Sequence, residues 1–150
     1  MFDVITGGTA VQDVFLRLPK QKNFKICFVE GSKNDMEEKP TFTSGGGAVN
    51  AAVTFARQGL KTAVLCKVSD DYFGKNLWKE LALEGIHCWK ISDAESGTGY
   101  TTILLSSSGE RTTLTYRGAS ENFHSGEIPF SEIKSKWAYI VPSHIDMILM

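Results

Sequence analysis

The sequence predicts an α/β fold in which helices pack on a parallel sheet. Apolar runs and amphipathic segments alternate from residue 2 to residue 85, which gives a strand–helix–strand–helix order. Residues 61–68 form a nearly unbroken apolar run, of the kind that is buried on both faces in a parallel sheet. In residues 44–59, three consecutive glycines lead into a helical pattern, which indicates a tight connection into a helix.

The composition is that of an ordinary globular protein with one domain core. Of the 150 residues, 42% are hydrophobic and 22% are charged, and the net charge of −1 gives no general attraction for nucleic acid or an anionic membrane. Cys27, Cys66 and Cys88 show neither metal nor redox spacing, which favours a reducing cytoplasm. No apolar run approaches membrane-spanning length. We therefore expect a cytoplasmic protein that binds neither nucleic acid nor membranes.

The first strand is expected at residues 2–8, an apolar run that ends in a glycine turn. Residues 9–18 then carry apolar side chains around a single acid, Asp13. A lone acid in such surroundings is more often a turn or cap residue than a binding site. Residues 25–30 are expected to form another strand, and residues 31–39 a charged, solvated connection.

The glycines of residues 45–47 remove every side chain from a short piece of backbone, so another group can approach the main chain closely. The helix that follows is expected to end at Gly59. Backbone N–H groups at its start are free to bind ligand oxygens, and Asn50 adds an amide in the first turn. The stretch lacks the third glycine of a dinucleotide fingerprint and the lysine of a phosphate loop. Taken alone, it is equally compatible with a tight turn packed on a strand.

A second helix is predicted after the cap Ser69-Asp70-Asp71 and ends at Gly85. Its inner stripe consists of Phe73, Leu77 and Leu81. Two adjacent carboxylates also suggest a metal ligand pair, but caps are far commoner at a helix start. We predict no metal site.

The rest of the chain reads as strands. Residues 86–91 form one, and residues 98–105 and 111–116 flank a polar turn as a β-hairpin. After a linker, residues 137–141 form a further buried strand, and residues 145–150 start a helix. Ser143 follows that strand at its carboxyl end, where ligands bind in open α/β sheets.

Several of these positions together resemble the ribokinase/PfkB family of carbohydrate and nucleoside kinases. The first family signature is matched by Gly45, Gly46, Asn50, Ala52 and Gly59, although Ser69 replaces its later glycine. Further matches are Asp70, Asp71 and Gly74, Thr98-Gly99, Gly109-Glu110-Arg111 and Gly118-Ala119, with Ser120 in place of the usual Asn.

The resemblance covers about residues 2–144 and implies a ribokinase-like three-layer α/β/α sheet with a small β-lid, of which this is the first half only. Residues 1–150 would be the N-terminal part of the kinase domain, with lid strands near 24–43 and 98–117. Full-length members carry an Asp-Thr-x-Gly-Ala-Gly-Asp type of motif in their second half, which supplies the general base and the phosphate site. No stretch of this sequence contains it. We therefore expect the ATP-binding half to be absent, no catalytic residue in this chain, and ATP and Mg²⁺ as cofactors of the full-length enzyme only.

The resemblance also implies where a small-molecule sugar or nucleoside binds. Asp13 would accept hydrogen bonds from substrate hydroxyls, although Val11 stands where the family often has Asn. Arg117 lies where a cation could approach a phosphorylated or anionic substrate. The alternative interpretation is that it is a solvated edge residue of the hairpin, which is the commoner case. The expected substrate-binding set is Asp13, Gly45, Gly46, Asn50, Thr101, Ile103 and Ser143.

Two functions from different classes follow. The first is the substrate-binding part of an ATP-dependent sugar or nucleoside kinase, cut short and inactive alone. The second is a non-catalytic sugar-binding or oligomerising module, in which the lid strands form a homodimer contact.

Overall fold

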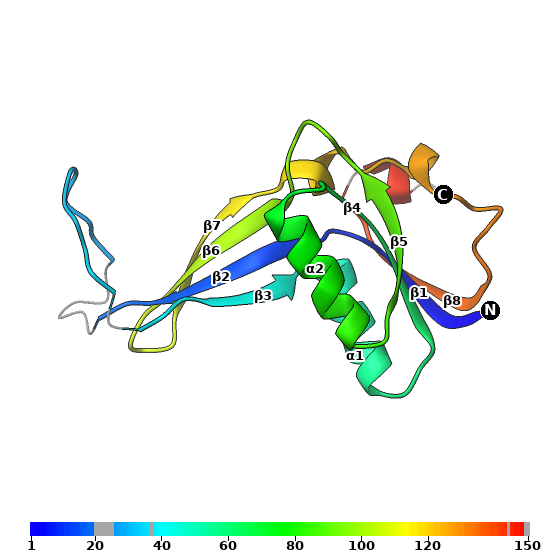
Figure 1. The fold of residues 1–150 in the computed structure, drawn as a ribbon, viewed down its shortest axis with the longest axis horizontal. Helices are drawn as coiled ribbons and strands as arrows, with labels where there is room; N and C mark the ends of the chain where they lie inside the picture. Colours follow the sequence, from blue (N-terminus) through cyan, green and yellow to red (C-terminus); the bar gives the residue numbers. More distant parts are fainter. Residues whose placement is uncertain (20–25, 37, 144, 149–150) are drawn as a thin grey trace.

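The computed structural model describes residues 1–19, 26–36, 38–143 and 145–148. These residues form two separate four-stranded sheets, which lie side by side in Figure 1. One sheet carries the α-helices on one of its faces, and the other extends away from it. In the described part of the chain, no helix is both long and apolar enough to cross a membrane.

The first sheet is entirely parallel, with strand order β5-β4-β1-β8. Its strands are β1 (Phe2–Gly8), β4 (Thr62–Val68), β5 (His87–Ser92) and β8 (Ser135–Val141). The central strands are buried on both faces, and Val64 and Cys66 face one side while Ala63 and Leu65 face the other. The parallel sheet predicted from the apolar runs is thereby confirmed. The expectation that residues 137–141 are buried is wrong for much of this strand, since residues 136–139 of the edge strand β8 are exposed.

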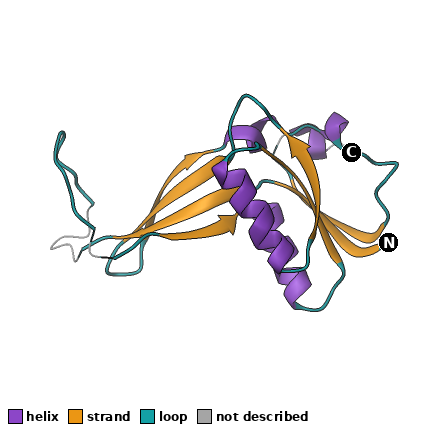
Figure 2. Cartoon of the chain, in the orientation of Figure 1, coloured by secondary structure: helices purple, strands orange, loops and turns teal. Residues whose placement is uncertain are grey.

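Helices α1 (Gly47–Arg57) and α2 (Tyr72–Leu83) cover one face of this sheet (Figure 2). Their inner residues pack with β4 in a core of Ala48, Val49, Ala52, Val64, Cys66, Leu77 and Leu81. The opposite face is covered by the 3₁₀ helices η1 (Gly118–Asn122), η2 (Ser125–Glu127) and η3 (Ile145–Ile148) and their connections. Phe123, Ile128 and Met147 of this layer pack against Ile5, Ala63 and Leu65 of the sheet.

The second sheet has strand order β3-β2-β6-β7. Its strands are β2 (Val11–Arg17), β3 (Thr41–Gly45), β6 (Gly99–Leu105) and β7 (Arg111–Tyr116). Strand β2 runs parallel to β6, whereas β3 and β7 are antiparallel to their neighbours. The hairpin expected from the sequence is therefore present as β6 and β7, outside the parallel sheet.

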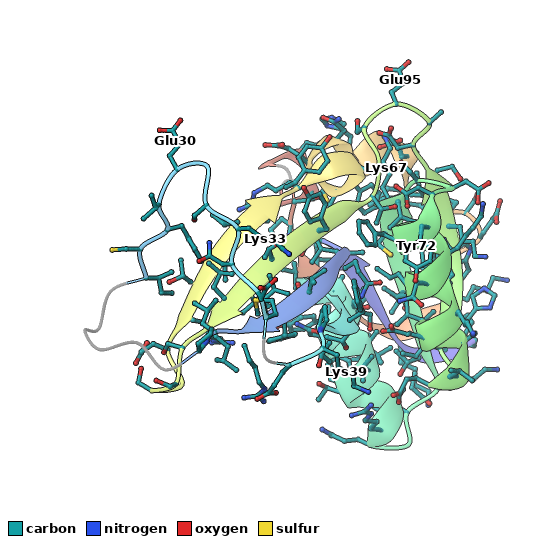
Figure 3. All side chains as sticks on the ribbon, turned by 60° about the vertical axis from the view of Figure 1, so that its left-hand side comes forward. Glu30, Lys33, Lys39, Lys67, Tyr72 and Glu95 are labelled. Carbon is teal, nitrogen blue, oxygen red and sulfur yellow. The ribbon has the colours of Figure 1, made fainter. Side chains whose placement is uncertain are left out.

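The strand expected at residues 25–30 is not present in its described part, since residues 26–36 contain no strand. Phe28 and Val29 are 55% and 76% exposed there, so this apolar run has neither a partner strand nor a core to pack on. Glu30 lies at the tip of a loop that projects from the second sheet (Figure 3). Within the described residues, the lid range 24–43 therefore contributes only β3. Residues 24, 25 and 37 lie outside the described ranges.

Candidate functional site

The glycine loop lies where the two sheets meet. Gly46 adopts a φ of 95°, and a Cβ atom there would stand 2.5 Å from the carbonyl oxygen of Thr9. Only glycine fits both the conformation and the space. The loop thereby brings the end of β3, the start of α1 and the end of β1 into contact.

Thr9, which follows β1, accepts hydrogen bonds from the first two N–H groups of α1. The Gly47 N–H donates to the Thr9 hydroxyl at 2.9 Å, and the Ala48 N–H donates to the Thr9 carbonyl at 3.2 Å. The expectation that the N–H groups of the helix start are free for a ligand is therefore wrong for these two residues. The reason is that a hydroxyl and a carbonyl from the neighbouring loop already satisfy them.

Asp13 lies in β2 with its carboxylate over the backbone of Gly45. In the sheet register it is opposite Thr43 of β3 and Thr101 of β6. A side chain at Gly45 would collide with the carboxylate oxygens of Asp13. Two of the residues predicted for the site, Asp13 and Gly45, are therefore in contact, and the Asp13 carboxylate explains on steric grounds why the first position of the motif is a glycine.

The carboxyl group of Asp13 is half-buried, and this desolvation raises its pKa even though a hydrogen bond with the Thr101 hydroxyl lowers it. The Thr115 hydroxyl in turn donates to the Thr101 hydroxyl at 3.3 Å. A carboxylate has acceptor positions for several donors, so further hydroxyl groups can bind to Asp13. The arrangement suits a ligand that is rich in hydroxyl groups.

Thr101 and Ile103 lie on the same face of the second sheet as Asp13. They are 8% and 6% exposed, and Ile103 stands opposite Phe15 in the register. One face of the sheet therefore places the acid and the hydroxyl side by side in one row and the apolar side chain of Ile103 in the next row on that face. This mixture can contact both the hydroxyl groups and the C–H surface of a sugar.

Asn50 is exposed on the first turn of α1 and lines a groove of about 470 Å³ with Thr43, Ser44, Arg57 and Glu80. Thr43 is also the residue opposite Asp13, so both candidates border the same residue of β3. That Asp13 and Asn50 converge on one pocket stays a prediction.

Ser143 follows β8 and is half-buried. Its hydroxyl oxygen lies 3.3 Å from both the carbonyl oxygen of Phe123 and the sulfur of Met147, so its single proton is shared between these two acceptors. These contacts join it to the layer that covers the sheet face opposite the helices. Its role in substrate binding stays a prediction.

A buried polar network that the sequence analysis did not identify joins the second sheet to α2. The Gln12 side chain is fully buried, and its amide donates to the Thr43 carbonyl at 2.6 Å. The Asn76 amide donates to Gln12 at 2.8 Å and to Glu80 at 2.9 Å. Glu80 also accepts from the Ser44 N–H at 2.5 Å. Because Gln12 precedes Asp13, the alternation of side chains along β2 is the signal that could have placed it on the opposite face.

Ser120, which replaces the Asn expected from the resemblance, is also buried at the junction. Its hydroxyl donates to the Ala10 carbonyl at 2.7 Å and accepts from the Ala10 N–H at 3.1 Å. Ala10 lies between Thr9 and β2. By binding both the N–H and the carbonyl of Ala10, Ser120 fixes the segment that leads into Asp13. A hydroxyl is able to do this because it is both donor and acceptor.

Asp71 is the cap of α2, as predicted, and it also binds the second sheet. Its carboxylate accepts from the Gly74 N–H at 2.8 Å and from the Thr98 N–H at 2.7 Å. Desolvation raises its pKa, but these hydrogen bonds outweigh it and hold the pKa below the ordinary value. Asp70 instead forms an exposed ion pair with Lys75 at 3.3 Å.

Lys67 holds the loops at the carboxyl end of β4 (Figure 3). Its ammonium lies 2.8 Å from Glu127 and 3.7 Å from Asp93, and it donates to the Asn122 carbonyl at 3.0 Å. Among the described residues, no group of three or more His, Cys, Asp or Glu side chains is arranged to hold a metal ion.

Comparisons with known proteins identify the family and the fold. Residues 11–141 match the model of the pfkB family carbohydrate kinases. A 5-dehydro-2-deoxygluconokinase of Clostridium tetani is 38% identical over 112 residues, which are 71% of this chain and 33% of the relative. One of Clostridium perfringens is 40% identical over 75 residues, 49% of this chain and 22% of the relative.

Solved structures show the same fold at lower identity. The ribokinase of Giardia lamblia has a TM-score of 0.76 at 18% identity, covering 93% of this chain and 44% of that protein. The fructokinase of Halothermothrix orenii has a TM-score of 0.73 at 22% identity, covering 98% of this chain and 51% of that protein. The chain thus spans about a third or less of the curated relatives and about half of the solved ones. With a family match over most of its length and a ribokinase-like fold, the chain belongs to the pfkB family of carbohydrate kinases.

Proposed function

We propose that this chain supplies the acceptor-binding part of an ATP-dependent sugar kinase, and that the acceptor is a sugar acid of the 5-dehydro-2-deoxygluconate type. The observation that carries the proposal is the half-buried Asp13 carboxylate, which lies over Gly45 and beside Thr101. The choice of acceptor comes from the printed names of the curated relatives.

The chemistry of Asp13 suits the binding of hydroxyl groups. An ionised carboxylate accepts short, charge-assisted hydrogen bonds from two neighbouring hydroxyls, and partial burial strengthens them. Gly45 leaves room beside the backbone for the Asp13 carboxylate, and Gly46 leaves room for the Thr9 carbonyl, so the two glycines let the proposed acceptor group stand at this junction. Asn50 and Ile103 complete the proposed contacts, and Ser143 is included because it follows the carboxyl end of β8, where ligands bind in open α/β sheets.

The proposed role of these residues is to hold and orient the acceptor hydroxyl. Binding the acceptor does not by itself lower the barrier to phosphoryl transfer. In a complete kinase domain, ATP supplies the phosphoryl group and Mg²⁺ neutralises charge on the phosphates. We propose both cofactors for the complete kinase domain.

Arg117 is the proposed contact for the carboxylate of a sugar acid. It directly follows β7, is exposed, and lies at the same end of the second sheet as Val11, Gly99 and Gly45. A guanidinium can bind a carboxylate through two parallel hydrogen bonds. A neutral sugar gains nothing from this residue, so Arg117 would select for the acid.

The test is calorimetric or NMR titration of the purified chain with 5-dehydro-2-deoxygluconate and with neutral fructose. We expect Asp13→Asn to weaken binding of both ligands at least about tenfold, since a hydrogen bond to a charged group contributes about 1.5–3 kcal/mol. Arg117→Gln should weaken binding of the acid alone. Asp70→Asn, at an exposed acid on the other side of the junction, is the matched control and should change neither affinity.

Affinity for the acid that survives Asp13→Asn unchanged would contradict the assignment of the site. Equal loss of both ligands in Arg117→Gln would contradict the selective role of Arg117 while leaving Asp13 in place.

A second candidate function, a homodimer contact through the second sheet, is favoured by one observation. On the face opposite Asp13, the sheet exposes the apolar side chains Phe42, Tyr100, Leu114 and Tyr116, each between 39% and 61% exposed. Contiguous exposed apolar surface of this kind marks an interaction site. We propose that a second copy covers it. Light scattering should then show a dimer that Leu114→Asp converts to a monomer; a monomeric parent chain would exclude this candidate.

A further inference from the structure

The peptide group that joins Thr43 to Ser44 in β3 is bound by side chains at both of its ends. Its C=O accepts from the Gln12 amide at 2.6 Å, and its N–H donates to the Glu80 carboxylate at 2.5 Å. In the strand order of the described residues β3 is an edge strand, so only one of its sides pairs with another strand. Helix α2, which lies beside the end of β3 in Figure 1, therefore supplies this strand with an acceptor from outside the sheet.

Asn76 fixes the direction in which the Glu80 carboxylate points. Its amide nitrogen donates to the Gln12 oxygen at 2.8 Å and to Oε1 of Glu80 at 2.9 Å. These two bonds use both hydrogens of the amide. The other carboxylate oxygen, Oε2, is the one that accepts from the Ser44 N–H. Both oxygens of Glu80 therefore act as acceptors, one toward its own helix and one toward β3.

This contact lies one residue before the proposed acceptor site. Gly45 follows Ser44, and the Asp13 carboxylate lies so close to it that a side chain there would collide with both carboxylate oxygens. Because a peptide group is planar and rigid, holding the group between Thr43 and Ser44 also sets the position of the Gly45 Cα atom. The place of Gly45 against the carboxylate thus depends on a side chain of α2.

Glu84, one turn farther along α2, provides a comparison. It lines the same groove of about 470 Å³ as Glu80. The guanidinium of Arg57 in α1 donates to both of its carboxylate oxygens. Glu84 therefore joins α2 to α1, whereas Glu80 joins α2 to the second sheet. The two acids share a helix and a groove but hold different elements.

We propose that Glu80 is a positioning residue for the acceptor site: by holding the peptide between Thr43 and Ser44, it keeps Gly45 against the Asp13 carboxylate in the geometry that binds the acceptor. The inference rests on the proposed function and adds to it a residue that acts through the backbone. A site that is held in its binding geometry before the ligand arrives loses less freedom on binding. Releasing this contact therefore weakens binding without removing a contact to the ligand.

The alternative is that Glu80 only attaches α2 to the second sheet and so stabilises the fold. Glu80→Gln separates the two roles, because it keeps the size of the side chain but replaces one acceptor oxygen by an NH₂ group. If the remaining oxygen accepts from Asn76, the NH₂ group faces the Ser44 N–H, donor against donor. The reverse orientation sets the NH₂ group against the Asn76 amide. One of the two hydrogen bonds must therefore be lost.

The first part of the test needs no ligand. NMR of the purified Glu80→Gln chain should show exchange of the Ser44 amide hydrogen at least about tenfold faster than in the wild type. The pKa of Asp13, followed through its carboxyl carbon, should fall from its raised value toward the ordinary one, because water reaches the carboxylate once Gly45 is released. Glu84→Gln is the matched control and should change neither measurement.

The second part is titration with 5-dehydro-2-deoxygluconate, at a temperature where every variant is folded. Glu80→Gln should weaken the affinity about fivefold, as expected for the loss of one hydrogen bond that holds the site. Glu84→Gln should leave the affinity unchanged. Leu81→Val, in the helix-side core of α2, is a control for lowered stability alone and should also leave it unchanged.

A Glu80→Gln chain that melts at a lower temperature but keeps the wild-type Asp13 pKa and affinity would overturn the proposal, since its role would then be structural only. Equal effects of Glu84→Gln would overturn it as well. Asn76→Ala removes the donor that orients Glu80, so it should give the same changes in weaker form, and it decides the question if Glu80→Gln does not fold.

A wild-type chain that does not bind the sugar acid would contradict the proposed function alone. The exchange of the Ser44 amide and the pKa of Asp13 are measured without ligand, so they still decide whether Glu80 holds Gly45 in place. Unchanged values of both in Glu80→Gln would then overturn the positioning role, and changed values would support it.

Discussion

The two sheets have the same number of strands but differ in how far their strands are buried. In β4 of the parallel sheet all residues but one are buried, whereas every residue of β7 in the second sheet is exposed. The parallel sheet is held by two apolar layers, one on each face. The second sheet is held mainly by backbone pairing and by polar contacts at its base. The comparison indicates that the stability of the chain is concentrated in the first sheet.

The polar groups that matter lie where the second sheet joins the first. Gln12, Thr101 and Ser120 are buried there with hydrogen-bond partners. Farther out, Ile103 and Leu104 of β6 remain buried, whereas β7 is exposed along its whole length. The base of the second sheet is thus joined to the rest of the chain by buried hydrogen bonds, while its outer strand β7 is exposed.

The largest effect is expected from a cavity in the helix-side core. Leu77→Ala removes a fully buried side chain of α2 and should lower the free energy of unfolding by about 2–5 kcal/mol. Leu114→Ala is the same change in β7, at a residue that is 61% exposed, and should cost less than about 0.5 kcal/mol in the monomer. Urea denaturation of both variants gives the comparison. Similar losses would mean that the two sheets contribute equally.

The next effect concerns the loop that joins the sheets. Gly46→Ala places a methyl group against the Thr9 carbonyl in a backbone with φ of 95°, and should cost about 1–3 kcal/mol. Gly59→Ala is the matched control, because its φ is 85° but no atom lies within 4 Å of the added Cβ. The difference between the two variants, measured by denaturation, isolates the close approach from the backbone strain. Equal losses would show that the contact with Thr9 is unimportant.

The sequence predicted the parallel sheet well because its signals are local. The run at residues 61–68 is buried as expected, and Asp71 caps α2 because a helix start needs an acceptor within three residues. The apolar run at residues 25–30 gave a wrong strand, because apolar character alone cannot show whether a partner strand exists. A correct prediction for this segment would require knowing which strands lie beside it in the fold.

The site was less predictable, because its contacts join segments far apart in the sequence. The pairing of Asp13 with Thr101 depends on the register of β2 against β6, which no local pattern states. Likewise, nothing near Thr9 or Ser120 indicates that one would cap α1 and the other bind Ala10. The positions of Asp13 and Gly45 came from the family resemblance, and their mutual contact came from the structure.

A smaller effect is expected at the cap of α2, where the core helix meets the second sheet. Asp71→Ala removes acceptors for the Gly74 and Thr98 N–H groups and should cost about 1 kcal/mol at pH 7. Because the folded chain lowers the pKa of Asp71, this stabilisation is complete above the ordinary value of about 3.9 and is lost as pH falls through the folded value. Denaturation of wild type and variant at pH 7 and at acid pH should show the difference shrinking. Asp70→Ala, at the exposed neighbour, is the control; a pH-independent difference would contradict this account.

The smallest effect, and the one of opposite sign, is expected at Asp13. Desolvation raises the pKa of this carboxyl in the folded chain, so its charged form destabilises the fold above that pKa. The penalty disappears as pH falls from the folded pKa toward the ordinary value. Asp13→Asn keeps the size of the side chain and an acceptor for the Thr101 hydroxyl but removes the charge. At pH 7 it should therefore raise the free energy of unfolding by less than about 1 kcal/mol, since solvent still screens a half-buried group.

The same substitution should remove most of the stabilisation that a bound sugar acid gives to the wild type, because a ligand that binds only the folded state stabilises it in proportion to its affinity. Denaturation curves with and without 5-dehydro-2-deoxygluconate, at pH 7 and near pH 4, measure both effects on one pair of proteins. A variant that is less stable without ligand would show that Asp13 supports the fold rather than the site. A variant that is more stable without ligand but is no longer stabilised by it would show that the charge of Asp13 binds the ligand and destabilises the fold.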